Sequence, residues 1–221
     1  MALEIEILPD ADAVAERGAA YVAERAQATV AEHGRFTFAV SGGHTPWAMF
    51  AELASQGTVW DAVVIYQVDE RVAPPDDPDR NLVHLTKALG SAPAQVRAMP
   101  VNSSDLAAAA ARYASWLPEH FDLVHLGLGP DGHTASLVPG DSVLEVADRD
   151  VAVTGEYQGR RRMTLTFPVL DRAHRILWLV TGADKVDALR RLRAGDHSIP
   201  GGRVGAANAL VVADEAAAPD G

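Results

Sequence analysis

The sequence contains no cysteine. This absence excludes disulfide bonds, zinc sites built on thiolates, iron–sulfur clusters and cysteine nucleophiles, and it fits a reducing compartment. No apolar stretch approaches the roughly 20 residues that a membrane-spanning helix needs. The first residues, MALEIEILPDADAV, carry acids where a secretory signal peptide carries Lys or Arg before an apolar run. We therefore expect a cytoplasmic protein that binds no membrane.

Basic residues are also scarce, since 19 Lys and Arg stand against 30 Asp and Glu, a formal net charge of -11. Binding a nucleic acid or an anionic lipid surface requires a net basic face, so the charge balance argues against both as partners. It leaves room for a small anionic ligand in a local basic pocket. With 48% hydrophobic and 22% charged residues, the composition is that of a folded globular protein. We expect one domain over residues 1–221, and a monomer is favoured.

Short apolar runs alternate with helical stretches, the pattern of a mostly parallel sheet with helices on its faces. Strands are expected over residues 3–8, 36–40, 62–68, 121–128, 163–167, 175–180 and 209–212. Helices are expected from a cap at residue 10 or 12 to Gly34, and over 47–53, 104–116 and 186–192. Residues 72–81 and 129–140 are interpreted as loops. The predicted fold class is a three-layer α/β/α domain with a mostly parallel, Rossmann-like sheet.

Four polar motifs lie where a predicted strand ends: SGGHTP, DER, GPDGHTAS and TGADK. In open α/β sheets, ligands bind at the edge formed by the carboxyl ends of the strands. The four motifs are therefore expected to share one site.

SGGHTP, residues 41–46, places two glycines before a predicted helix. The backbone N–H groups of Gly43, His44 and Thr45 are suited to an anion, with the helix dipole behind them. The motif lacks the Lys-Ser/Thr ending of a nucleotide-binding P-loop, which disfavours ATP or GTP. Two alternatives stay open: a simple tight turn, and a nucleophile elbow in which Ser41 attacks the substrate. The elbow is disfavoured because it normally follows several strands, and Ser41 follows the second.

GLGPDG, residues 127–132, formally matches the dinucleotide fingerprint, with Asp148 or Asp150 near the distance expected for a ribose partner. Too few strand–helix units follow it to build the usual dinucleotide fold. A rigid turn that displays His133 is the favoured interpretation. His133 is the predicted acid/base group, because the unperturbed pKa of histidine lies nearest neutrality. Asp131, two residues earlier, is its expected partner.

Charged residues at the other strand ends have both a functional and a structural interpretation. Asp69 and Glu70 are candidates for paired acid/base carboxylates, with Arg71 as a clamp for an anionic or carbonyl oxygen. The alternative is a solvated strand end with a local ion pair. Lys185, and one arginine among residues 160–162, are candidates to complete a phosphate site, although such residues are usually surface charges.

The motifs SGGHTP, VDERVAPPDDPDRN, LGLGPDGHTASLVPG, RMTLT and TGADK, in this order, resemble the 6-phosphogluconolactonase family. The likeness runs from about residue 36 to about residue 190. The related glucosamine-6-phosphate deaminases usually have DEY and DGHIAF in place of DER and DGHTAS, so Arg71 and residues 134–136 favour the lactonase. The resemblance implies a sheet of the sugar-phosphate isomerase type.

The resemblance also implies hydrolysis of 6-phospho-D-glucono-1,5-lactone to 6-phosphogluconate, the second step of the oxidative pentose phosphate pathway, without metal or cofactor. His133 would then be the general base that activates water, Asp131 would orient its ring, and Arg71 or loop N–H groups would stabilise the oxyanion. The phosphate would lie on residues 43–45. The substrate-binding set is completed by Ser41, Gly42, Asp69, Arg162 and Lys185. Arg162 is preferred over its neighbours because it directly precedes the MTLT strand.

One departure and several rival functions accompany this interpretation. IPGGRV, residues 199–204, stands where the family often has Pro-Ala-Ser, which leaves any role for Arg203 open. The rivals are an amino-sugar phosphate deaminase, a nicotinamide enzyme, a serine hydrolase acting through Ser41, and a non-catalytic sugar-phosphate sensor.

Overall fold

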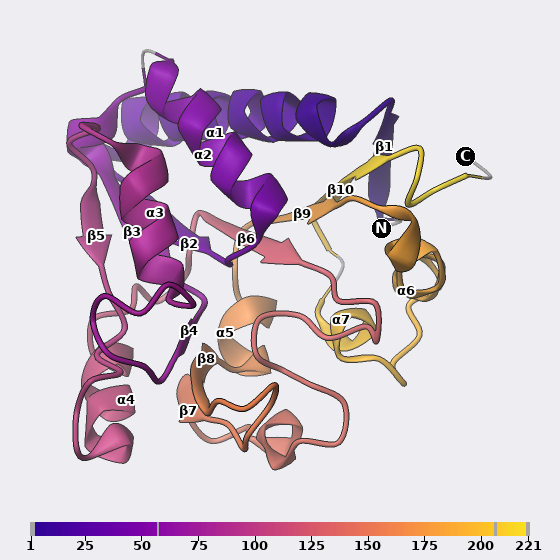
Figure 1. Cartoon of the computed structure of the whole chain (residues 1–221). Helices are drawn as coiled ribbons and strands as arrows, with labels where there is room; N and C mark the ends of the chain where they lie inside the picture. Colours follow the sequence, from indigo (N-terminus) through magenta and orange to yellow (C-terminus); the bar gives the residue numbers. More distant parts are fainter. Residues whose placement is uncertain (1–2, 57, 206, 220–221) are drawn as a thin grey trace.

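A seven-stranded parallel sheet forms the centre of the molecule (Figure 1). The computed structural model describes residues 3–56, 58–205 and 207–219. Within this part of the chain the strand order is β1-β10-β9-β6-β2-β3-β5, and every neighbouring pair is parallel. The strands are β1 (Glu4–Leu8), β2 (Phe36–Val40), β3 (Val63–Gln67), β5 (Gln95–Arg97), β6 (Leu123–Gly127), β9 (Ile176–Val180) and β10 (Ala209–Asp214). The predicted fold class is confirmed.

Helices cover both faces of this sheet, and each face has its own apolar core. One face carries α1 (Ala11–His33), α2 (His44–Ser55) and α3 (Asn81–Leu89). The other carries α4 (Leu106–Ala114), α5 (Phe167–Asp171) and α6 (Val186–Arg193), with the short α7 (Pro200–Arg203) beside them. Three 3-10 turns lie at Trp60–Ala62, Ser142–Glu145 and Ala183–Lys185. Because both faces are covered, β2, β3 and β9 are buried along their whole length.

Sequence-level signals set the ends of the first helix. Asp10 accepts a hydrogen bond from the backbone N–H of Ala13, 2.9 Å away, and so caps α1. Gly34 ends the helix in the left-handed conformation, with φ of 74°. In β2, Phe36 and Phe38 pack into the core beneath α1 and α2, while Ala39 packs into the opposite core. The alternation follows from the period of two in a strand.

A second sheet corrects two predicted strands. β4 (Asp69–Arg71), β8 (Arg162–Leu165) and β7 (Val151–Val153) form an antiparallel sheet beside the main one. The strand expected over residues 62–68 ends at Gln67, and the DER motif is itself a strand of this second sheet. The strand expected over 163–167 ends at Leu165, and α5 follows, because Pro168 lacks the N–H needed to continue a ladder and suits the first turn of a helix.

The topology opens a crevice between β2 and β6. From β2 the chain builds the sheet outward through β3 and β5, and from β6 it builds the opposite half through β9 and β10. Successive connections therefore leave the carboxyl ends of β2 and β6 toward opposite faces. Such a switch point is where doubly wound sheets bind their ligands.

Candidate active site

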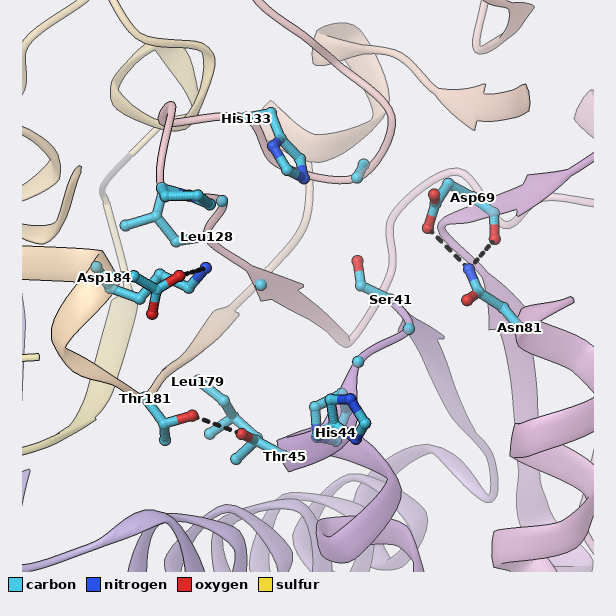
Figure 2. A pocket seen from close by; sticks show the side chains of 18 of the residues that line it. Ser41, His44, Thr45, Asp69, Asn81, Leu128, His133, Leu179, Thr181 and Asp184 are labelled. Atoms are coloured by element: carbon cyan, nitrogen blue, oxygen red, sulfur yellow. Dashed lines mark hydrogen bonds and ion pairs between the residues drawn. The ribbon is translucent and has the colours of Figure 1, made fainter. Parts of the chain in front are cut away.

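A cavity of about 430 Å³ lies at the carboxyl ends of β2 and β6 (Figure 2). All four predicted motifs contribute to its walls. The predicted site residues that line it are Ser41, Gly42, Gly43, His44, Thr45, Asp69, Arg71, His133, Arg162 and Lys185. Asp131 lies behind His133 and contacts it. The shared site expected at the strand ends is therefore present in the structure.

The SGGHTP segment forms the floor of the cavity. Gly43, with φ of 143°, is the N-cap of α2, so the first-turn amides of His44 and Thr45 lie at the positive end of the helix dipole. Ser41 is buried, and its hydroxyl has no hydrogen-bond partner among the described residues. Figure 2 shows this hydroxyl directed into the cavity. The floor thus offers polar groups that no protein atom satisfies.

His133 and Asp131 form a tight pair on the loop after β6. The ring Nδ1 of His133 lies 2.5 Å from Asp131 Oδ1, which also accepts the backbone N–H of His133 at 3.1 Å. Burial acts to raise the pKa of Asp131, but these bonds from His133 outweigh it and hold the pKa below its usual value. With Nδ1 donating to the carboxylate, Nε2 remains as the proton acceptor of the ring.

Glycine is required behind this pair. A Cβ at Gly129 would overlap the ring of His133 and approach the Asp131 carboxylate. Gly132 has φ of 80° and lies against Ile199, so a side chain there would be both strained and crowded. No helix follows Gly132 directly, and Asp150 is paired with Arg172 at 2.7 Å. The formal dinucleotide fingerprint is therefore the rigid turn that displays His133.

Tyr157 is a contact of the pair that the motifs did not indicate. Its ring meets that of His133 edge-on, with centroids 5.6 Å apart, and the guanidinium carbon of Arg162 lies 5.0 Å from the centroid of the tyrosine ring. The tyrosine thus contacts both the candidate base and a candidate anion-binding cation. It sits in a short hairpin turn closed by the Tyr157–Arg160 bridge, which carries no strand pattern in the sequence.

Arg71 and Arg162 lie directly opposite each other in the β4–β8 ladder. The sequence predicted that Arg162 precedes the strand, but in the structure it is the first residue of β8. Burial, together with the charge of Arg71, lowers the pKa of Arg162, and its Nε has no hydrogen-bond partner. Neither guanidinium forms an ion pair with a carboxylate among the described residues. Two cations are therefore held side by side with no direct ion-pair partner among the described residues, although the nearby charge of Asp69 partly offsets the lowering of the Arg162 pKa.

Asp69 and Glu70 do not form a carboxylate pair, which corrects that interpretation. Asp69 faces the cavity, where its Oδ2 accepts the hydroxyl of Ser136 at 2.6 Å. Glu70 points away from the cavity and is fully buried. It accepts the backbone N–H groups of Asn81 and Leu82, at 2.8 and 2.9 Å, and so anchors the start of α3. Its role is structural.

Lys185 and Arg203 occupy different surroundings. Lys185 lines the cavity and pairs with Asp184 at 2.8 Å, and this pairing lowers the pKa of Asp184. Thr45 and Thr181 join the first turn of α2 to the loop after β9 through hydroxyls 2.7 Å apart (Figure 2). Arg203 does not line the cavity and instead lies 4.6 Å over the ring of Phe167.

The geometry gives the serine-nucleophile alternative no support. A nucleophilic serine needs a base within hydrogen-bond reach of its hydroxyl. The nearest histidine contact of Ser41 is its backbone N–H, which donates to Nδ1 of His125 at 3.4 Å. Burial lowers the pKa of His125 to about 3, so the ring is neutral. His125 therefore supports the loop and does not activate the hydroxyl.

Among the described residues, no cluster of three or more His, Asp or Glu side chains has the arrangement needed to hold a metal ion. Within the same part of the chain, every helix is too short or too polar to cross a bilayer.

Comparison with known proteins identifies the family. The model of the family "Glucosamine-6-phosphate isomerases/6-phosphogluconolactonase" matches residues 9–212. The chain belongs to this family. A 6-phosphogluconolactonase from Nostoc sp. is 34% identical over 204 residues, covering 86% of this chain and 85% of the relative. The predicted enzyme class, a protein of the 6-phosphogluconolactonase type, is thereby confirmed.

Solved structures agree on the fold. A 6-phosphogluconolactonase from Shewanella baltica superposes with a TM-score of 0.87 at 24% identity, over 96% of this chain and 97% of that one. A monomeric glucosamine-6-phosphate deaminase reaches a TM-score of 0.82 at 19% identity, over 98% and 99% of the two chains. At these identities the likeness concerns the fold alone. The functional distinction within the family rests on the site.

Proposed function

We propose that this family member hydrolyses 6-phospho-D-glucono-1,5-lactone to 6-phosphogluconate. The observation that carries the proposal is the His133–Asp131 pair, whose Nε2 is free to accept a proton beside a cavity lined by Arg71 and Arg162. A base and an unpaired cationic wall are what hydrolysis of an anionic ester requires. The names of the relatives support the same substrate class.

The proposed reaction begins with attack of water on the lactone carbonyl. Nε2 of His133 takes the proton from this water as the new C–O bond forms, and Asp131 stabilises the resulting imidazolium through Nδ1. Negative charge develops on the former carbonyl oxygen, where the Arg71 guanidinium or a loop N–H donates to it. The tetrahedral intermediate then collapses. The C–O bond to the ring oxygen breaks, and His133 returns its proton to that oxygen as a hydroxyl.

The phosphate is assigned to the floor of the cavity. The amides of Gly43, His44 and Thr45 lie at the N-terminus of α2, and helix N-termini attract anions. Arg162 and Lys185, which both line the cavity, supply positive charge. In this pose Ser41 and Asp69 contact the sugar or its phosphate ester.

A coupled assay of lactone decay, with and without the protein, tests the proposal. We expect the protein to accelerate hydrolysis of the phospholactone and to prefer it over unphosphorylated gluconolactone. His133→Ala should abolish the acceleration, and Asp131→Asn should lower kcat about 100- to 10,000-fold, by analogy with other mis-oriented histidine bases. His33→Ala is the matched control, because this histidine is exposed at the end of α1, away from the cavity.

Three results would contradict the proposal. The first is an unchanged rate in His133→Ala. The second is release of ammonia from glucosamine 6-phosphate without lactone hydrolysis, which would indicate a deaminase. The third is binding of 6-phosphogluconate with no effect on lactone decay, which would indicate a sensor.

A further inference from the structure

We infer that Asn81 is a positioning residue of this site, which holds Arg71 toward the substrate while leaving its charge unneutralised. The inference rests on the proposed function, and it concerns a residue that the sequence motifs left without a role. Asn81 is the first residue of α3, is buried, and lines the cavity.

The side-chain amide of Asn81 is bonded on both sides. Its Nδ2 donates to the backbone oxygen of Asp69 at 3.0 Å and to Oδ1 of Asp69 at 3.3 Å (Figure 2). Its Oδ1 accepts from the guanidinium of Arg71. Only this orientation of the amide satisfies both partners, because the Arg71 guanidinium can only donate and the backbone oxygen of Asp69 can only accept. The amide is therefore locked.

Asn81 also joins three segments of the site. Its backbone N–H is held by buried Glu70 at 2.8 Å, which fixes the start of α3. Through Asp69 it reaches Ser136, which belongs to the loop that carries His133. On its third side lies Gly42, where a Cβ would overlap the Asn81 amide. Asn81 thus fixes the position of the phosphate-binding floor relative to the arginine wall, which is formed by Arg71 and Arg162.

An amide suits this position better than a carboxylate. A carboxylate would hold Arg71 equally well, but it would pair with the guanidinium and cancel the charge that an anionic ligand needs. It would also place a second negative group against Asp69. The neutral amide orients the guanidinium and leaves its full charge directed at the cavity.

A double-mutant cycle tests whether Asn81 acts through Arg71. We expect Asn81→Ala to lower kcat/KM for the phospholactone about 10- to 100-fold, the cost of a misplaced catalytic or binding group. In an Arg71→Ala background the same change should alter kcat/KM by no more than about twofold. Equal losses in both backgrounds would overturn the inference. Thr86→Ala, on the exposed side of α3, is the matched control for the helix.

Asn81→Asp keeps the size of the side chain and remains informative if Asn81→Ala fails to fold. It should raise KM for the phospholactone about tenfold or more, with a smaller effect on unphosphorylated gluconolactone. A wild-type KM in folded Asn81→Asp would show that neutrality at this position is unimportant. Circular dichroism and urea unfolding establish that each variant is folded.

A binding measurement separates this inference from the proposed function. Calorimetry with 6-phosphogluconate on the same variants needs no turnover. If the unchanged protein binds this probe but hydrolyses no lactone, the proposed reaction is wrong, and the cycle in Kd still tests Asn81. A loss of affinity in Asn81→Ala that disappears in the Arg71→Ala background supports the positioning role, and one that persists there refutes it.

Discussion

Glu70→Gln is expected to destabilise the protein strongly, although it changes one atom outside the cavity. The Glu70 carboxylate is fully buried and accepts four hydrogen bonds. Oε1 accepts the backbone N–H groups of Arg71 and Asn81, both at 2.8 Å. Oε2 accepts from Gln67 and Leu82 and lies 3.2 Å from Nε of buried Arg80.

The expected loss follows from this geometry. A glutamine can place its oxygen on one side, and its NH₂ group then faces the donors on the other. Two buried donors lose their acceptor, at about 1–3 kcal/mol each, and Arg80 loses its counter-charge. These contributions overlap, so we take the cost of breaking a buried ion pair, about 3–5 kcal/mol, as the expected decrease in the free energy of unfolding. For a chain of this size the corresponding decrease in Tm is roughly 6–20 °C.

Urea unfolding at pH 7, followed by circular dichroism, measures this decrease. Glu4→Gln on the edge strand β1 is the control, because this glutamate is exposed, and its effect should stay within about 0.5 kcal/mol. In an Arg80→Met background, Glu70→Gln should cost less, since no buried cation is then left unpaired. A decrease below about 1 kcal/mol would refute the structural role assigned to Glu70.

Three further predictions concern the site and its support. Gly129→Ala should lower kcat about 10- to 100-fold with little change in stability, because the added Cβ displaces the His133 ring. Steady-state assays measure this loss, and an unchanged kcat would contradict it. Buried His125 has its pKa lowered to about 3, so acidification favours the unfolded state, and stability is lost as pH falls below about 6.5. Urea unfolding should give about 2 kcal/mol less stability at pH 5 than at pH 7 from this group, and His125→Leu should reduce the difference. Arg162→Met should raise the free energy of unfolding by about 1 kcal/mol or more, because it removes a desolvated charge opposite Arg71, while weakening the binding of 6-phosphogluconate measured by calorimetry.

The inner strands of the central sheet could be predicted because they are buried on both faces, whereas the three-residue edge strand β5, which is largely exposed, was not expected. Strands buried on both faces are continuous apolar runs, and residues 36–40 match β2 in the structure. Caps gave equally local signals, as Asp10 and Gly34 show at the two ends of α1. Because parallel strands share a carboxyl edge, the motifs at their ends could be assigned to one site without knowledge of the strand order.

The second sheet could be predicted only in part. The strand expected over residues 163–167 overlaps β8, but β4 and β7 have three residues each, too short for a period of two to be recognised. The pairing that places Arg71 opposite Arg162 joins positions far apart in the sequence. Asn81 stands at the end of a Pro- and Asp-rich segment that predicts a loop, and Arg80, the N-cap of α3, makes no side-chain cap. The backbone N–H of Asn81 at the start of α3 donates instead to the carboxylate of Glu70, eleven residues earlier in the sequence.

The arginine wall explains how a chain with a net charge of -11 can select an anion. Like charges directly opposite each other in an antiparallel ladder destabilise it, and burial of Arg162 adds a desolvation cost. Buried Arg80 and half-buried Arg172, in contrast, have carboxylate partners, Glu70 and Asp150. Arg71 has a neutral amide instead. A ligand with two negative charges would pair with both guanidiniums at once. Binding would relieve the repulsion between the two arginines, and this gain contributes to the free energy of binding. The acidic surface elsewhere does not oppose binding, because solvent screens its charges.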